Sequence, residues 1–210
     1  MTRHISRRRL LGVAAALTLA IGRRPAWAQN IPADAPIQAL NDALLQIMHA
    51  GKKAAFGERA RIAGPAIETA FDLPTILKVS VGPHWSALPM PQQIELTEVF
   101  RRYTVDSYVA NFDGFSGEKF QILPETRNVG TDLVVETRIV SPGGDATRLD
   151  YVMRHGGSGW KAVDVLLDGS ISRVAVQRSD FRALLGGGDA TKLIASLRTK
   201  ATALEAGGKA

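Results

Sequence analysis

The chain has 210 residues, no cysteine, and 26 lysine and arginine residues against 20 aspartate and glutamate residues. The absence of cysteine excludes disulfide bonds, thiol catalysis and thiolate metal sites. Six arginines and no acidic residue lie in residues 1–28, so residues 29–210 contain 20 basic and 20 acidic residues. This balance lacks the basic excess of a nucleic-acid-binding surface, and we expect no nucleic-acid partner.

Residues 1–28 have the three parts of a signal peptide. Three consecutive arginines, Arg7 to Arg9, precede an apolar run over residues 10–21, and Ala26-Trp27-Ala28 fits the small-residue pattern of a cleavage site. The run is shorter than the roughly 20 residues of a membrane-spanning helix. The paired arginines favour twin-arginine export over the general secretory route. The sequence therefore predicts cleavage after Ala28, a periplasmic location and a linker over residues 29–35.

Helical spacing of apolar residues predicts three helices between residues 36 and 81. The first starts at Pro36, because proline is tolerated in a first helical turn, and ends near Gly51. The second covers residues 58–70 and contains Gly64-Pro65, which should disturb it. A short third helix follows and ends before the Gly-Pro pair at residues 82–83.

A longer helix over residues 91–112 is predicted to be apolar on two sides. Such a helix lies between two layers of core or along a cavity, and the spacing alone favours the core. The two stripes are Leu96, Val99, Phe100 and Tyr103 on one side, and Val105, Tyr108, Val109 and Phe112 on the other.

Alternation of apolar and polar residues predicts four strands, over residues 118–123, 132–140, 147–154 and 160–167. Short links that contain glycine join them, which is typical of hairpins and hence of an antiparallel meander. In the third strand Leu149, Tyr151 and Met153 share one face, whereas Asp150 and Arg154 share the other. We therefore expect one apolar face, covered by helices.

Two more helices are predicted after the strands, over residues 174–185 and from Asp189 to about residue 204. The glycines at 186–188 separate them, and Asp189 is a good N-cap residue. The order of helices, strands and helices predicts a single α+β domain over residues 36–205, followed by a flexible tail over residues 206–210.

The residues that carry chemistry give no catalytic or metal-binding pattern. The three histidines after residue 28, His49, His84 and His155, lack metal-ligand spacing, so we predict no metal site. Three acids stand in apolar surroundings and leave one alternative open, a small-molecule enzyme on a cone-shaped α+β fold. These acids are Asp106, Asp150 and Asp164.

A series of short motifs in a fixed order resembles the MlaC family of periplasmic phospholipid-binding proteins, also called toluene-tolerance proteins. The resemblance extends over residues 58–204. It implies a curled four-stranded antiparallel sheet covered by helices, with an apolar cavity between them, and no cofactor. The motifs are Phe71-Asp72, Gly82-x-x-Trp85, Phe100, Tyr108, Ser116-Gly117-Glu118, Tyr151, Gly159-Trp160-Lys161-Ala162-Val163-Asp164-Val165 and Arg178-Ser179-Asp180-Phe181.

The resemblance also implies a function, that of a monomeric carrier of phospholipid between the outer and inner membranes. Its expected partners are an outer-membrane lipoprotein complex and an inner-membrane ABC transporter with an MCE-domain subunit. A branch of the family is associated with hopanoid lipids, and the motifs do not separate the two ligands. The family places lipid tails among bulky apolar residues. The matching positions, with Phe112 added from the long helix, are Phe71, Trp85, Phe100, Tyr108, Phe112, Tyr151, Val163, Val165 and Phe181.

Overall fold

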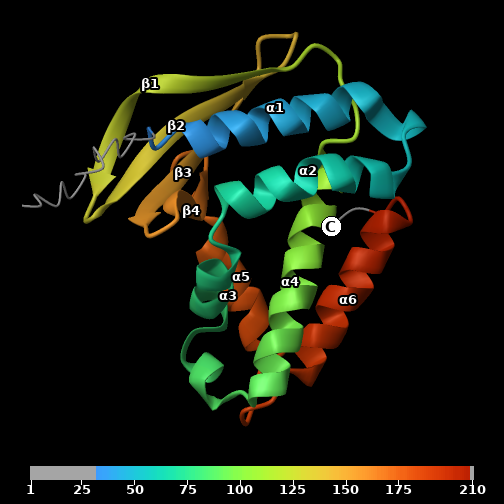
Figure 1. Ribbon diagram of the computed structural model, residues 1–210, viewed down its shortest axis with the longest axis vertical. Coiled ribbons are helices and arrows are strands. Elements are labelled where there is room, and N and C mark those ends of the chain that lie inside the picture. Colours follow the sequence, from blue (N-terminus) through green and yellow to red (C-terminus); the bar gives the residue numbers. More distant parts are fainter. Residues whose placement is uncertain (1–31, 209–210) are drawn as a thin grey trace, which may run out of the picture. The chain divides into compact units, whose positions relative to one another are not determined.

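Six helices and five strands make up the part of the chain that a computed structural model describes, residues 32–208 (Figure 1). The predicted signal peptide and residues 29–31 lie outside this part, as do residues 209–210. The helices are α1 (Ala35–Ala50), α2 (Phe56–Ala70), α3 (Leu73–Val81), α4 (Met90–Asn111), α5 (Arg173–Arg182) and α6 (Thr191–Glu205), with two 3₁₀ turns, η1 (Gly51–Lys53) and η2 (Gly82–Ala87). Within residues 32–208 no helix combines the length and the apolar character needed to cross a membrane.

The helix starts follow local rules of capping. Pro36 lies in the first turn of α1, where its missing N–H costs no hydrogen bond. The Asp72 carboxylate caps α3, accepting from the Thr75 backbone N–H at 3.1 Å and from its hydroxyl at 2.7 Å.

The helix α2 continues through Pro65, so the expected disturbance there does not end it.

Helices α4 and α6 run side by side in the same direction (Figure 1). Polar contacts connect them: Gln92 near the start of α4 donates to Asp189, just before α6, at 2.7 Å, and Arg102 near the middle of α4 pairs with Glu205 at the end of α6 at 2.7 Å. In the same way α3 lies beside α5, and α1 packs on α2. The main contacts between helices and sheet are those of α2, α3 and α5 with β4, whereas α6 packs on α4.

The sheet confirms the predicted antiparallel meander. Its strands are β1 (Lys119–Val129), β2 (Asp132–Val140), β3 (Ala146–Gly156), β4 (Gly159–Leu167) and β5 (Ile171–Ser172), and each pairs with the next along the chain. The prediction of four strands missed β5, because two residues are too few to show alternation. The first strand is also longer than the predicted 118–123.

Two irregularities change which side chains face the helices. One lies in β1, between Ile122 and Thr126. The other leaves Val163 without a partner in β3, because Ala162 pairs with Met153 and Asp164 with Val152. Such a bulge bends its strand and resets the alternation of side chains. After it, Val165 rather than Asp164 continues the inner face that Ala162 begins.

The helix boundaries after the sheet differ slightly from the prediction. Helix α5 ends at Arg182, three residues before the predicted end, and α6 begins at Thr191 with Ala190 as its N-cap residue. The Asp189 carboxylate still accepts from the Thr191 backbone N–H at 3.1 Å, one position outside the predicted cap. The predicted N-cap residue therefore contributes to the helix start without occupying the cap position.

Candidate functional site

A cavity of about 490 Å³ lies between the helices and the inner face of the sheet, and it is partly open to solvent. Its volume is within the range of about 300–1,000 Å³ that is usual for ligand sites. The lining comes from α3, α4, α5, β2, β3 and β4, with Phe71 preceding α3. The lining residues are Phe71, Leu73, Ile76, Phe100, Tyr103, Thr104, Ser107, Tyr108, Asn111, Phe112, Ile139, Thr147, Leu149, Tyr151, Asp164, Val165, Leu167, Arg173, Val174 and Gln177.

One face of α4 forms a whole wall of this cavity. The wall residues follow helical spacing over three turns and include both aromatic and small polar side chains. The small polar groups are satisfied within the helix: the Thr104 hydroxyl donates to the Phe100 carbonyl, and the Ser107 hydroxyl to the Tyr103 carbonyl. The full stripe is Phe100, Tyr103, Thr104, Ser107, Tyr108, Asn111 and Phe112.

The sheet forms the opposite wall with paired residues from neighbouring strands. Leu149 of β3 pairs with Leu167 of β4, and Tyr151 pairs with Val165. On the other side of β3, Thr147 pairs with Ile139 of β2. Because side chains alternate along a strand, residues at every second position line the cavity.

Aromatic rings pack against one another at the centre of the site. The Phe71 ring lies 5.6 Å from the Tyr108 ring and 6.0 Å from the Tyr151 ring, measured between centroids. Tyr108 stacks on Phe112 at 6.0 Å, and Phe112 contacts Phe120 at 5.9 Å. These separations are within the favourable range for aromatic pairs, so the rings form a continuous apolar surface.

The floor and the rim of the cavity differ in polarity. Phe71, Phe100 and Tyr151 are buried, whereas the lining residues Asn111 and Arg173 are exposed at the opening. Burial raises the pKa of Tyr151 and raises that of Tyr108 well above its ordinary value. Both hydroxyls are therefore neutral, and the floor carries no charge.

A comparison with protein-family models finds one family whose model matches this chain. The model described as "MlaC protein" matches residues 38–199, more than half of the chain. The chain belongs to the MlaC family. The family match covers every element from α1 to most of α6, and therefore every residue that lines the cavity.

A solved structure shares the fold of this MlaC-family chain. It is described as the phospholipid-binding protein from Ralstonia solanacearum in complex with a phospholipid. The two chains are 20% identical and superpose with a TM-score of 0.70, covering 82% of this chain and 98% of the other. At this identity the likeness establishes the shared fold. A search of curated proteins finds no match to the chain.

Six of the nine side chains predicted to bind lipid line the cavity, and three do not. Trp85 lies in η2, where the Lys78 ammonium is 5.9 Å from its ring centroid. Val163 is the bulge residue of β4, and Phe181 packs edge-on against Phe100 at 6.3 Å. The six that line the cavity are Phe71, Phe100, Tyr108, Phe112, Tyr151 and Val165.

The sequence prediction missed residues of two kinds. Polar members of the α4 stripe, such as Ser107 and Asn111, were missed because hydrophobicity alone does not mark them, although helical spacing from Phe100 would have included them. Leu73 and Ile76 of α3 were missed because no motif pointed to that helix.

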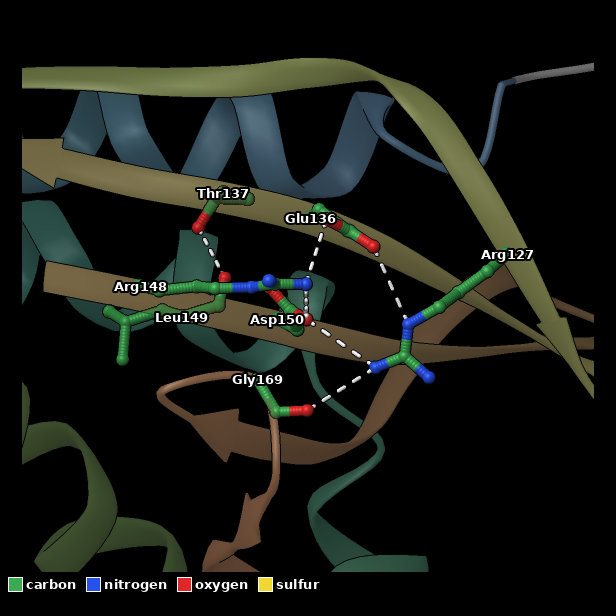
Figure 2. Close-up of polar contacts among 7 residues, drawn as sticks. All are labelled: Arg127, Glu136, Thr137, Arg148, Leu149, Asp150 and Gly169. Atoms are coloured by element: carbon green, nitrogen blue, oxygen red, sulfur yellow. Dashed lines mark hydrogen bonds and ion pairs between the residues drawn. The ribbon is translucent and has the colours of Figure 1, made fainter.

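The acid Asp150, considered above as a catalytic group, lies on the outer face of the sheet. Its side chain is 0% exposed and accepts two hydrogen bonds from Arg148, at 2.9 and 2.8 Å. Arg127 reaches it from β1 at 3.4 Å, and Glu136 of β2 pairs with both arginines (Figure 2). This carboxylate is therefore part of an ion-pair network that holds three strands together.

Asp164 and Asp106 lie in two further places. Asp164 lines the cavity, but its oxygens accept from the Val165 and Val174 backbone N–H groups and from the Ser172 hydroxyl. Asp106 faces α6, with Arg102 at 3.5 Å. The three acids thus do not share a site, and no observation favours the enzyme hypothesis. Within residues 32–208 there is also no group of three potential metal ligands.

Proposed function

We propose that this protein is a periplasmic carrier that encloses the acyl chains of a phospholipid in the cavity between α4 and the sheet. The observation that carries the proposal is the cavity itself, about 490 Å³ in volume, with aromatic and aliphatic walls and an opening to solvent. The membership in the MlaC family supports it, as does a phospholipid complex of a protein with the same fold.

The physics of transfer explains why such a protein needs a cavity rather than a catalytic group. Each methylene removed from water gains roughly 0.8 kcal/mol, so two acyl chains with about 28 methylenes would cost on the order of 20 kcal/mol to expose. A lipid therefore does not cross an aqueous gap at a useful rate without cover. Apolar walls supply the cover, and the opening lets the polar headgroup stay hydrated.

The wider role that we propose is transfer between the outer and inner membranes. In this proposal the partners are an outer-membrane lipoprotein complex and an inner-membrane ABC transporter with an MCE-domain subunit. Export by the predicted signal peptide over residues 1–28 would place the protein between them. Family membership supports this role. Pull-down of each complex with the purified protein, loaded with lipid or empty, tests it.

The first test of the proposed function is mass spectrometry of the purified protein, under native conditions and after organic extraction. We expect one phospholipid per chain. Substitution Val165→Glu places a charge in the cavity and should abolish co-purification of lipid. Val163→Glu is the matched control, because Val163 lies two residues away on the same strand and does not line the cavity.

Each outcome of this test has a separate meaning. A hopanoid in place of a phospholipid would assign the protein to the other branch of the family. Equal lipid content in the two variants would show that the cavity is not the binding site. A protein without lipid that also takes none from vesicles would contradict the proposed function. Circular dichroism of both variants establishes that they are folded.

A further inference from the structure

Arg173 is a charged residue at the cavity that has no partner within residues 32–208. It is the first residue of α5, it lines the cavity, and it is exposed. Within the described residues it makes no ion pair and donates no side-chain hydrogen bond, unlike the arginines of the outer sheet face. A guanidinium group has five N–H donors and no acceptor, and it matches the geometry of phosphate oxygens.

The other polar groups of the lining are mostly satisfied by the protein itself. Asn111 donates to the Ser107 carbonyl at 2.8 Å, and Gln177 accepts from the Ser80 hydroxyl at 3.2 Å. Asp164 accepts from the Ser172 hydroxyl and the Val174 backbone N–H at the start of α5, and from the backbone N–H of its neighbour Val165. The Asp164 carboxylate is thus held by donors of the protein itself. Arg173 is the lining residue whose positive charge can attract an anion.

Two tyrosines extend this set of unpaired donors toward the floor. Tyr151 is buried and Tyr108 half-buried, both line the cavity, and neither hydroxyl has a hydrogen-bond partner within residues 32–208. Both rings lie against Phe71, at 6.0 and 5.6 Å between centroids, in the cavity that Arg173 also lines. Neither hydroxyl oxygen is fully buried, so each can donate to a ligand in the cavity.

We propose that Arg173 binds the phosphate of the lipid at the cavity mouth, and that the Tyr108 and Tyr151 hydroxyls donate to oxygens of the same ligand below it. This inference rests on the proposed carrier function and adds the residues that recognise the headgroup of its ligand. The site selects for phosphate over a neutral headgroup on identical tails. A neutral hopanoid lacks the group that Arg173 recognises.

The experiment compares two lipids that differ only in the phosphate, dioleoyl phosphatidic acid and dioleoylglycerol. Each is dispersed in cyclodextrin and titrated into delipidated protein, and displacement of the neutral dye N-phenyl-1-naphthylamine from the cavity gives the affinity. We expect wild type to bind phosphatidic acid about ten-fold or more tightly than dioleoylglycerol, the size of one charge-assisted hydrogen bond. Arg173→Gln should bring this ratio close to one, and Arg173→Lys should restore part of it.

Arg178→Gln is the matched control. Arg178 lies on the same helix and carries the same charge, but it does not line the cavity, so this variant should keep the wild-type ratio. A wild-type ratio near one, or the same ratio in Arg173→Gln as in wild type, would overturn the phosphate assignment while leaving the carrier function in place. Failure of both lipids to displace the dye would instead contradict the carrier function.

Calorimetry with inorganic phosphate distinguishes a headgroup site from a site for the free anion. We expect no measurable heat at millimolar phosphate, because the site needs the buried tails to hold the ligand. Binding of inorganic phosphate that is lost in Arg173→Gln, without any preference for phosphatidic acid, would assign the site to free phosphate and overturn the lipid headgroup as its ligand.

Discussion

At the scale of single residues, Asp106 shows how burial changes a carboxyl group. Its side chain is 6% exposed, Arg102 lies 3.5 Å from it, and Oδ2 has no hydrogen-bond partner within residues 32–208. Burial and, second, repulsion by Glu205 raise the pKa of Asp106 to about 6, although Arg102 acts in the opposite direction. In the unfolded chain this group titrates near 3.9.

We predict that Asp106→Asn removes a pH dependence of stability. Between pH 4 and pH 6 the folded protein holds a proton that the unfolded chain releases, so the free energy of unfolding falls as the pH rises through this window. The amide does not titrate, so the variant lacks this loss. The free energy of unfolding of the variant minus that of wild type should therefore increase by about 2 kcal/mol from pH 4 to pH 7. Urea denaturation at several pH values measures it. Parallel curves for wild type and variant would contradict the prediction.

Asp150 is the opposite case, a buried carboxylate with two cationic partners. We predict that Asp150→Ala lowers the free energy of unfolding by about 1–3 kcal/mol, because it leaves Arg148 and Arg127 without their shared partner. The loss stays below that of a fully buried pair, because both arginine side chains keep about 40% of their surface exposed. Glu136→Ala, at the more exposed acid of the same network, should cost less, and an equal or greater loss there would refute this ranking.

At the scale of elements, Asp164 joins the end of the sheet to α5. Its carboxylate accepts from the Val174 backbone N–H at 3.1 Å in the first helical turn, and from the Ser172 hydroxyl before it. Asp164→Ala should therefore destabilise the protein by about 1–2 kcal/mol, as the loss of a helix cap does, and speed hydrogen exchange in the first turn of α5. Asp180→Ala, an exposed acid of the same helix, is the control and should leave that exchange slow.

The elements could be predicted from the sequence wherever one signal dominated. The alternation of side chains predicted β2 over residues 132–140, the range that the structure shows, and Gly-containing links predicted the hairpins. The bulge at Val163 was not predicted, although the sequence marks it: Ala162 and Val163 are consecutive apolar residues, and the alternation changes phase between them. Val163 was placed among the site residues because it matches a family position, whereas Leu167 lies outside the family motifs. In α4 the cavity stripe was hidden by Thr104 and Ser107, whose hydroxyls bond to their own helix.

At the scale of the whole molecule, the described domain combines a packed core with a cavity beside it. Ile37 of α1, Phe100 of α4 and Met153 of β3 belong to one buried cluster. Tyr108 and Val165 pack against this cluster and also line the cavity. The cavity thus lies at the junction of sheet and helices, where α4 serves both as core and as wall. A ligand there contacts elements from both halves of the chain.

This arrangement predicts that lipid stabilises the domain as a unit. A ligand that binds only the folded state adds RT ln(1 + [L]/Kd) to the free energy of unfolding, about 2.7 kcal/mol at 100 times Kd. Delipidated protein should therefore melt at a lower temperature than protein reloaded with phosphatidic acid, and the difference should increase with lipid concentration. Scanning calorimetry measures it, with Val163→Glu keeping the shift and Val165→Glu losing it. An equal shift in both variants would mean that the lipid stabilises the protein from outside the cavity.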